Sequence, residues 1–250
     1  MIVGYDQGFR APNLDDLTSR QQTGPGFQFE NPELAPERSQ TWELGVDLRS
    51  DGWRADAWLF VTYIDDAIVR AVRQQSDCPE ATPQCSASRT QYQLVNSEGR
   101  ARVFGSEASL WKAFDVGLTL RAMLSWAWGD GPDIGGEPGA PRVPLSRIPP
   151  LTGAFEVTYR HFETGLLGGL ALRWAGAQSR LAPSDASDAR IPVGGTPGYG
   201  VLDLRFAWRY GSSSRVGLVW ENVLDSAYRV HGSSINGPGT GLSATLEWSL

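Results

Sequence analysis

The sequence predicts an all-β protein, a transmembrane antiparallel β-barrel, and three observations support this fold class. Apolar and polar residues alternate over long stretches, as they do in strands with a lipid face and a watery face. Short and long connections alternate along the chain. Aromatic residues gather at the ends of the predicted strands. A mean hydropathy of −0.28 does not oppose this interpretation, because the two faces of such strands cancel in an average.

Period-2 alternation defines the strands. In residues 199–210, Leu202, Leu204 and Phe206 fall on one face, and Asp203 and Arg205 fall on the other. The same pattern predicts ten strands, over residues 1–9, 39–49, 53–72, 90–113, 116–128, 150–161, 165–176, 199–210, 215–223 and 240–250. Many of them reach ten residues or more. That length suits a membrane strand of about nine to eleven residues better than a soluble strand of about five or six.

The connections give an independent signal. Short links fall at residues 50–52, 114–115, 162–164 and 211–214, and long links at 10–38, 73–89, 129–149, 177–198 and 224–239. The two kinds alternate strictly. Outer-membrane barrels have short periplasmic turns and long extracellular loops. We therefore expect the long links to be extracellular and both ends of the chain to lie on the periplasmic side.

Aromatic residues in phase with the apolar faces predict two interfacial girdles. The extracellular set is Trp42, Trp126, Trp128 and Trp174, and the periplasmic set is Trp53, Tyr159, Trp208, Tyr210 and Trp248. The alternative, a soluble β protein with aromatic residues in its core, would have to explain the charged residues on the opposite faces. Trp58 and Trp111 fall on the lumen side, where packing is favoured over a role as a ligand platform.

The two cysteines, Cys78 and Cys85, are predicted to form a disulfide within the long link 73–89. A metal site is less favoured, because no second cysteine pair or nearby histidine completes four ligands. A disulfide implies an oxidising compartment. The formal net charge of −6 argues against a nucleic-acid partner, which would require a basic face.

No catalytic constellation is predicted. The chain has no Gly-x-Ser-x-Gly motif, no phosphate loop and no cluster of metal ligands, so we expect neither an enzyme nor a cofactor. Asp65 and Asp66 are adjacent and point to opposite faces of a strand. His231 with Asp225 is the one loose candidate for a catalytic pair, and a solvated loop histidine is the favoured interpretation.

Several stretches, in this order along the whole chain, resemble the TonB-dependent receptor family. They are Gly8-Phe9-Arg10-Ala11-Pro12-Asn13-Leu14, Asn31-Pro32-Glu33-Leu34, the strand from Glu37 to Gly45, Tyr92 to Asn96, Gly105-Ser106-Glu107, Pro144 to Pro150, and Glu221 to Arg229. The resemblance implies that residues 1–250 are the last ten strands of a plugged barrel of about twenty-two strands.

The resemblance also implies a function, which is uptake of a scarce nutrient such as a ferric siderophore, haem or cobalamin across the outer membrane of a Gram-negative bacterium. Expected partners are that chelate, outer-membrane lipid with lipopolysaccharide, and the TonB complex acting through a plug. The plug and a signal peptide have no counterpart in these residues, so we expect a fragment whose Met1 is an internal methionine or a misplaced start. Haem receptors of the family carry a histidine between the first two boxes, and residues 13–30 contain none. The chain ends in Leu250, where the family usually has an aromatic residue.

The long link 10–38 is the candidate ligand-contact segment. It combines charged, amide and aromatic side chains suited to an anionic chelate with apolar parts, namely Arg10, Arg20, Gln21, Gln22, Phe27 and Phe29. A generic surface loop is the alternative. A second function class is a self-contained ten-stranded outer-membrane barrel acting as an enzyme or adhesin. It would require residues 1–9 to pair with residues 240–250.

Overall fold

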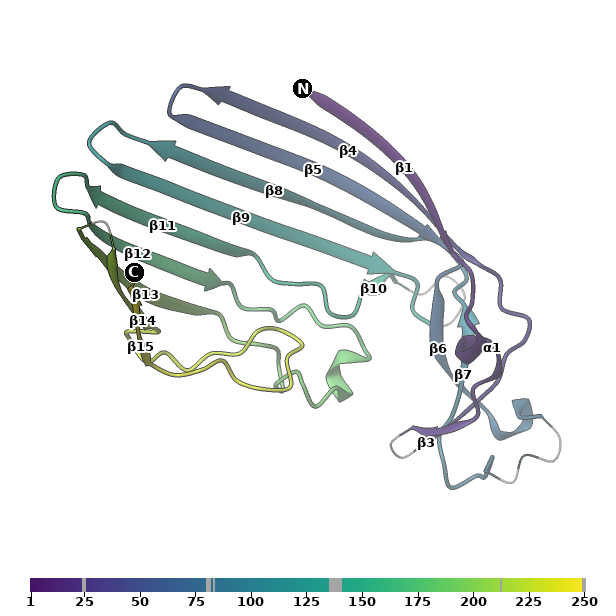
Figure 1. Cartoon of the computed structure of the whole chain (residues 1–250). Coiled ribbons are helices and arrows are strands. Elements are labelled where there is room, and N and C mark those ends of the chain that lie inside the picture. Colours follow the sequence, from purple (N-terminus) through teal and green to yellow (C-terminus); the bar gives the residue numbers. More distant parts are fainter. Residues whose placement is uncertain (24–25, 80–81, 83, 135–140, 212, 249–250) are drawn as a thin grey trace.

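The computed structural model describes residues 1–23, 26–79, 82, 84–134, 141–211 and 213–248, and ten long strands form one curved antiparallel sheet (Figure 1). The strands are β1 (Ile2–Arg10), β4 (Glu37–Ser50), β5 (Trp53–Asp65), β8 (Ala101–Ala113), β9 (Leu118–Gly131), β11 (Thr152–His161), β12 (Leu166–Ala175), β13 (Tyr199–Tyr210), β14 (Ser214–Glu221) and β15 (Gly241–Trp248). They lie side by side in chain order. The predicted antiparallel strands are confirmed.

The sheet is open. Within the described residues, β1 pairs only with β4 and β15 pairs only with β14, so these two strands are the free edges. The pairing that a self-contained ten-stranded barrel would require is therefore missing. The structure instead matches part of a larger barrel.

Short turns join neighbouring strands at one end of the strands, and the long loops leave from the opposite end (Figure 1). Two glycines fit the tight turns because they adopt positive φ. Gly52, with φ +74°, follows β4, and Gly117, with φ +87°, precedes β9. A Cβ atom on Gly117 would lie 2.2 Å from the carbonyl oxygen of Arg160 on the neighbouring strand. The alternation of short and long links thus corresponds to the two opposite ends of the strands.

The predicted strands 53–72 and 90–113 require a correction, because each is two strands. The first breaks between β5 and β6 (Ile68–Arg73), where Asp66 has φ +56°, and the second breaks between β7 (Gln91–Asn96) and β8, where Gly99 has φ +94°. A residue in the left-handed region cannot continue an extended strand. β6 and β7 therefore leave the curved sheet.

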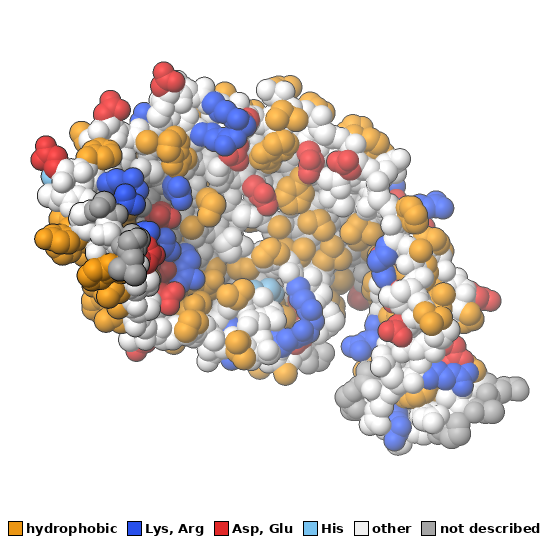
Figure 2. All heavy atoms as spheres, viewed as in Figure 1, with side chains coloured by type: hydrophobic (Ala, Val, Ile, Leu, Met, Phe, Trp, Pro, Cys, Tyr) orange, Lys and Arg blue, Asp and Glu red, His pale blue; other side chains and the backbone are white. Residues whose placement is uncertain are grey.

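These two strands join a second, four-stranded sheet with β2 (Gln21–Thr23) and β3 (Gly26–Phe29), in the order β2-β3-β7-β6. We call it the small sheet. It protrudes from the curved sheet as a separate lobe (Figure 2). A further two-residue strand, β10 (Val143–Pro144), extends the loop end of β9.

The two faces of the curved sheet differ as the alternation predicts. Apolar side chains on one face are largely exposed, and Leu48 and Leu246 remain 51% and 71% accessible. The other face carries charges and small residues. Trp58 lies on this inner face against Gly45, where a Cβ atom would be 2.5 Å from the indole ring. Glycine at position 45 is therefore what makes room for the inward tryptophan, in agreement with the packing role expected for it.

Helical structure is limited to α1 (Leu14–Thr18) and two 3-10 turns, η1 (Gln75–Asp77) and η2 (Asp185–Ser187). Among the described residues, no helix has the length and apolar character needed to cross a membrane.

Candidate ligand-contact surface

The segment after β1 is ordered by a helix cap. Asn13 and Asp16 form a capping box, in which the backbone N–H of Asp16 donates to Oδ1 of Asn13 at 2.8 Å and the reverse bond is 3.0 Å. Arg10 then binds Asp16 through Nη1 at 2.8 Å and also pairs with Glu37 on the adjacent strand. The predicted contact residue Arg10 is thus held at the root of the loop, with its side chain 46% accessible.

Arg20 and Gln22 lie on the accessible surface of the small sheet. Nε of Arg20 donates to Oε2 of Glu30 at 2.6 Å, and a second bond joins the same two groups. These hydrogen bonds lower the pKa of Glu30 below its ordinary 4.5. The Arg20 side chain stays 50% accessible, so it is fixed in direction and still open to a ligand.

Phe27 and Phe29 are placed differently from the expectation. They are 4% and 2% accessible and belong to the buried strand β3. Gly26 makes room for Tyr92, whose ring would lie 2.3 Å from a Cβ atom at that position. The two phenylalanine rings therefore form the core of the small sheet and are not exposed on its surface. Sequence reasoning assigned the whole segment to a loop and so could not anticipate a second hydrophobic core.

A disulfide joins Cys78 to Cys85 at the far end of the small sheet. Gln91, 2% accessible, closes the same region, because its Nε2 donates to the carbonyl oxygens of Ser86 and Arg89 at 2.9 Å each. Among the described residues between β6 and β7, Cys78 and Cys85 are thereby held by a covalent bond, and Ser86 and Arg89 by a buried amide.

Two asparagines attach the small sheet to the curved sheet. Asn96 exchanges hydrogen bonds with the backbone of Ala35, both at 2.8 Å, and also donates to the carbonyl oxygen of Asp66 at 2.7 Å. Asn31 donates to the carbonyl oxygen of Leu94 at 2.8 Å. These contacts give one asparagine of each motif, Asn31 and Asn96, a structural role: they connect β7 to the segments that lead into β4 and out of β5.

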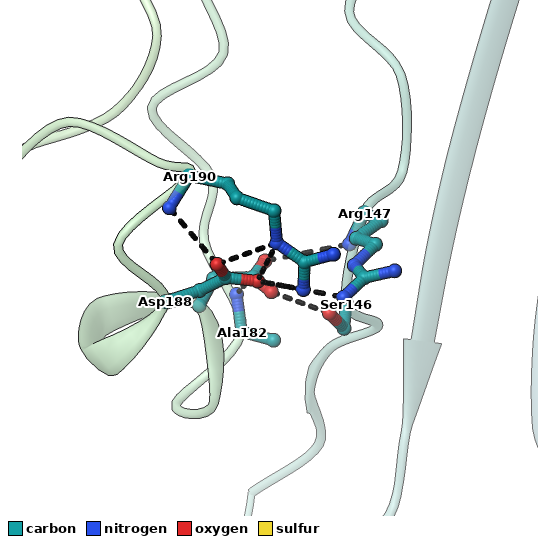
Figure 3. A network of polar contacts seen from close by, with 6 residues as sticks. Ser146, Arg147, Ala182, Asp188 and Arg190 are labelled. Atoms are coloured by element: carbon teal, nitrogen blue, oxygen red, sulfur yellow. Dashed lines mark hydrogen bonds and ion pairs between the residues drawn. The ribbon is translucent and has the colours of Figure 1, made fainter. Parts of the chain in front are cut away.

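A second group of loops lies over the later strands. Asp185, 2% accessible, accepts from Ser146 Oγ and from the backbone N–H of Ala182, and Asp188 forms a two-pronged pair with Arg190 (Figure 3). Arg147 has φ +58° and lies 3.5 Å from Asp188. The loops after β9 and β12 are therefore tied together by a buried carboxylate.

The loop after β14 completes this second group. Buried Asn222, with φ +46°, donates to the carbonyl oxygens of Ser226 and Pro238 at 3.0 Å each, which closes the base of the loop. Nδ1 of His231 lies 2.9 Å from Oγ1 of Thr196. Asp225 instead accepts from the N–H of Thr240 at 2.9 Å. The loose pair of His231 with Asp225 thus has other partners in the structure.

A cavity of about 440 Å³ lies between the loops that follow β12 and β14. Its lining combines apolar and polar side chains: Pro192, Pro197, Tyr228, Arg229 and Asn236. Nε of Arg229 donates to Oδ1 of Asn236 at 2.8 Å, and Tyr228 packs against Tyr199 at a ring distance of 4.9 Å. Sequence reasoning missed this cavity, because the lining comes from two loops whose contact no local pattern predicts.

The inner face of the curved sheet presents paired charges below these loops. Arg173 lies 3.2 Å from Asp203, Arg205 lies 3.7 Å from Glu156, and Oγ of Ser109 donates to Asp56 at 2.5 Å. In the part of the chain that the structure describes, no group of three metal-ligating side chains is present. The arrangement is suited to binding polar or charged groups by side-chain contacts.

The sequence profile described as "TonB dependent receptor-like, beta-barrel" matches residues 2–223. The haemoglobin and haemoglobin-haptoglobin-binding protein of Haemophilus ducreyi is 29% identical over 171 residues, which are 63% of this chain and 17% of that protein. Among solved structures, the copper transporter OprC aligns with a TM-score of 0.73 at 20% identity, over 99% of this chain and 36% of OprC.

Two further structures show the same fold. The Serratia marcescens hemophore receptor HasR, solved with its hemophore HasA and haem, has a TM-score of 0.70 at 20% identity. The FrpB iron transporter from Neisseria meningitidis has a TM-score of 0.64 at 19% identity. This chain spans 36% and 32% of their lengths. The profile match covers most of the 250 residues, and the chain therefore belongs to the TonB-dependent receptor β-barrel family.

Proposed function

We propose that this chain is the C-terminal portion of the barrel of an outer-membrane receptor that takes up a scarce, metal-containing nutrient. The observation that carries the proposal is the curved sheet itself, with an apolar outer face, a charged inner face, free edges at β1 and β15, and long loops gathered at one end. In such a barrel the loops face the medium and the charged face lines the lumen.

The loop chemistry supports the proposed substrate class. Arg20 and Arg229 keep their guanidinium groups fixed by a single neighbour each, and the cavity beside Arg229 has apolar walls. Fixed arginines beside apolar surface suit an anionic chelate with apolar parts, such as a ferric siderophore or haem. The relatives named for iron, haem and copper support a metal-containing nutrient. Energy would come from the TonB complex acting on a plug domain that these residues do not include.

The test uses the full receptor that contains this chain. A deletion strain is complemented with the receptor, its outer membrane is isolated, and growth is measured when iron is supplied only as a ferric siderophore or as haem, or when cobalamin is limiting. Growth restored by one of these nutrients, together with recovery of the receptor in the outer membrane, is the expected result. Outer-membrane recovery without uptake of any metal-containing nutrient would contradict the proposal.

The self-contained barrel with an enzymatic or adhesive function is not favoured, because β1 and β15 lie at opposite ends of the strand order. The loop residues are tested separately. Arg20→Ala and Arg229→Ala are each expected to weaken ligand binding roughly tenfold, the loss of one charge-assisted contact. Gln40→Ala, on the outer face of β4, is the matched control. Unchanged affinity in both arginine variants would remove these loops from the binding site.

A further inference from the structure

Charge on the outer face of the curved sheet is confined to strand ends. At the outward positions of the ten strands, within the described residues, the Lys, Arg, Asp and Glu side chains are Arg38, Asp65, Arg102, Lys112 and Asp130. Four of them lie at the loop ends of β4, β5, β8 and β9. Lys112 lies at the turn end of β8. The loop-side rim of β11 to β15 carries no such charge at its outward strand positions, so this feature belongs to one sector of the barrel.

Neighbouring loops add three arginines to the same sector: Arg100, Arg142 and Arg180. Arg102 binds Asp130 through Nε and Nη2 at 2.8 and 3.0 Å, and Nε of Arg142 donates to the same carboxylate at 2.7 Å. The Asp130 side chain is 6% accessible, whereas those of Arg102 and Arg142 are 46% and 38% accessible. One buried carboxylate therefore fixes two guanidinium groups that both remain open to the surroundings.

Arg100 and Arg180 are also held by neighbouring groups. Arg100 binds Asp65 through Nε and Nη2 at 2.8 and 2.9 Å, and its guanidinium lies 5.2 Å from the ring of Tyr63. Arg180 lies 4.0 Å from the ring of Trp128 and donates to a backbone carbonyl at 2.7 Å. The rim cluster is Arg38, Arg100, Arg102, Arg142 and Arg180 with Asp65 and Asp130. Five positive and two negative groups leave an excess of three positive charges.

The aromatic residues beside the rim cluster set its depth in the membrane. Phe104 packs against Trp126 and Trp128 on the same outward face, at ring distances of 5.7 and 4.8 Å. Tryptophan belts of membrane barrels lie at the level of the lipid headgroups. The arginines of the rim cluster follow directly beyond these rings toward the loops. They therefore lie at the height of the headgroups of the outer leaflet.

We propose that the rim cluster binds the phosphate groups of a phosphorylated lipid headgroup, that of lipopolysaccharide, in the outer leaflet around the barrel. The inference rests on the outer-membrane location in the proposed function. Planar guanidinium groups form two-pronged hydrogen bonds to phosphate oxygens, which makes arginine suited to such sites. Because acidic partners already hold Arg100, Arg102 and Arg142 in place, little freedom of these side chains is lost when the lipid binds.

The test uses the full receptor, purified in detergent and titrated with bisphosphorylated lipid A, with the same lipid lacking both phosphates, and with inorganic phosphate. The variant R102Q/R142Q removes the two arginines around Asp130, and R142Q alone, whose arginine lies outside the long strands, serves if the double variant fails to insert. The control is K112Q, which removes one positive charge from the same face at the opposite end of β8.

The expected result is that R102Q/R142Q binds lipid A at least about tenfold more weakly, that K112Q binds like the unmodified receptor, and that removing the lipid phosphates has the same effect as the double variant. Unchanged binding in R102Q/R142Q and R142Q would overturn the inference. So would full competition by inorganic phosphate at equal concentration, which would indicate a free-phosphate site. Nutrient uptake and outer-membrane recovery are measured in parallel. If both persist while the lipid result is negative, the inference fails and the proposed function stands.

Discussion

Replacing Phe29 by alanine is expected to destabilise the small sheet and to leave the barrel wall folded. Phe29 is 2% accessible and lies in β3, one of the two central strands of the small sheet, which pairs with β2 on one side and β7 on the other. Truncation of a buried phenylalanine costs roughly 3–5 kcal/mol. The other buried apolar residues of this region are only Phe27, Leu34 and Ala71 among the described residues. Such a small core has little reserve, so we expect the small sheet to open while the curved sheet stays folded.

Hydrogen exchange of the full receptor measures this effect. A loss of at least 3 kcal/mol in local stability corresponds to exchange at least about a hundredfold faster in β3 and β7. The strands β8 and β9, which share 12 register pairs with each other, should keep their protection. Phe206→Ala, the same substitution on the outer face of β13 where the ring is 42% accessible, is the control and should leave β3 unchanged.

Two results would refute this reasoning. If F29A leaves exchange in β3 and β7 unchanged, then Phe29 is not the core of the small sheet. If F29A abolishes the heat-modifiable band of the folded barrel on a gel, then the small sheet and the curved sheet form one cooperative unit. The contacts of Asn96 with Ala35 and Asp66 would then transmit the loss.

Four further results are expected. Replacing Cys78 and Cys85 by serine should destabilise the small sheet by about 2.5 kcal/mol, because the disulfide closes a loop across a sequence separation of seven residues. Thiol labelling that finds both cysteines free in the exported receptor would contradict the disulfide. The pKa of Glu30 is lowered, so the Arg20 pair stabilises β2 and β3 fully above about pH 4.5 and loses this effect as pH falls through the folded pKa. Local stability from hydrogen exchange, corrected for the intrinsic pH dependence of amide exchange, is measured in R20A and in the unmodified receptor, and the same pH dependence in both would oppose this. Asn222→Ala should loosen the loop after β14, seen as faster proteolysis between residues 224 and 239, with Gln40→Ala unchanged. Residues 1–250 refolded alone in detergent should show no heat-modifiable band, because β1 and β15 leave unpaired edges; a compact, heat-modifiable monomer would revive the closed-barrel alternative.

The barrel wall was predictable because lipid imposes one rule on every strand. Between the strand ends, outward residues are mostly apolar and inward residues can be polar, so the sequence of each strand shows a period of two. Eight of the ten predicted strands each correspond to one described strand whose bounds differ from the prediction by at most three residues, and β13 covers residues 199–210 as expected. The aromatic residues of the two predicted girdles all lie at outward positions of these strands.

The small sheet was not predictable in this way. One strand is predicted over residues 53–72 and one over residues 90–113, although the chain changes direction at Asp66 and Gly99. Two residues with positive φ decide the break, and only one of them is a glycine. The partner strands β2 and β3 are three and four residues long, which is too short for a period to be recognised.

The candidate contact residues fall into an accessible group and a buried group. Arg10, Arg20 and Gln22 lie on the accessible surface, where composition alone indicated them, while Phe27 and Phe29 are buried. An aromatic residue in a long loop is ambiguous, because it serves equally well as a ligand contact or as the core of a structure within the loop. Loops of this length that hold their own hydrophobic core present a fixed surface, and the ligand would then meet positioned guanidinium groups. Binding to a fixed surface costs less ordering entropy than binding to a mobile loop. The disulfide, the buried Gln91 and the asparagine contacts therefore bear on affinity even though none of them needs to touch the nutrient.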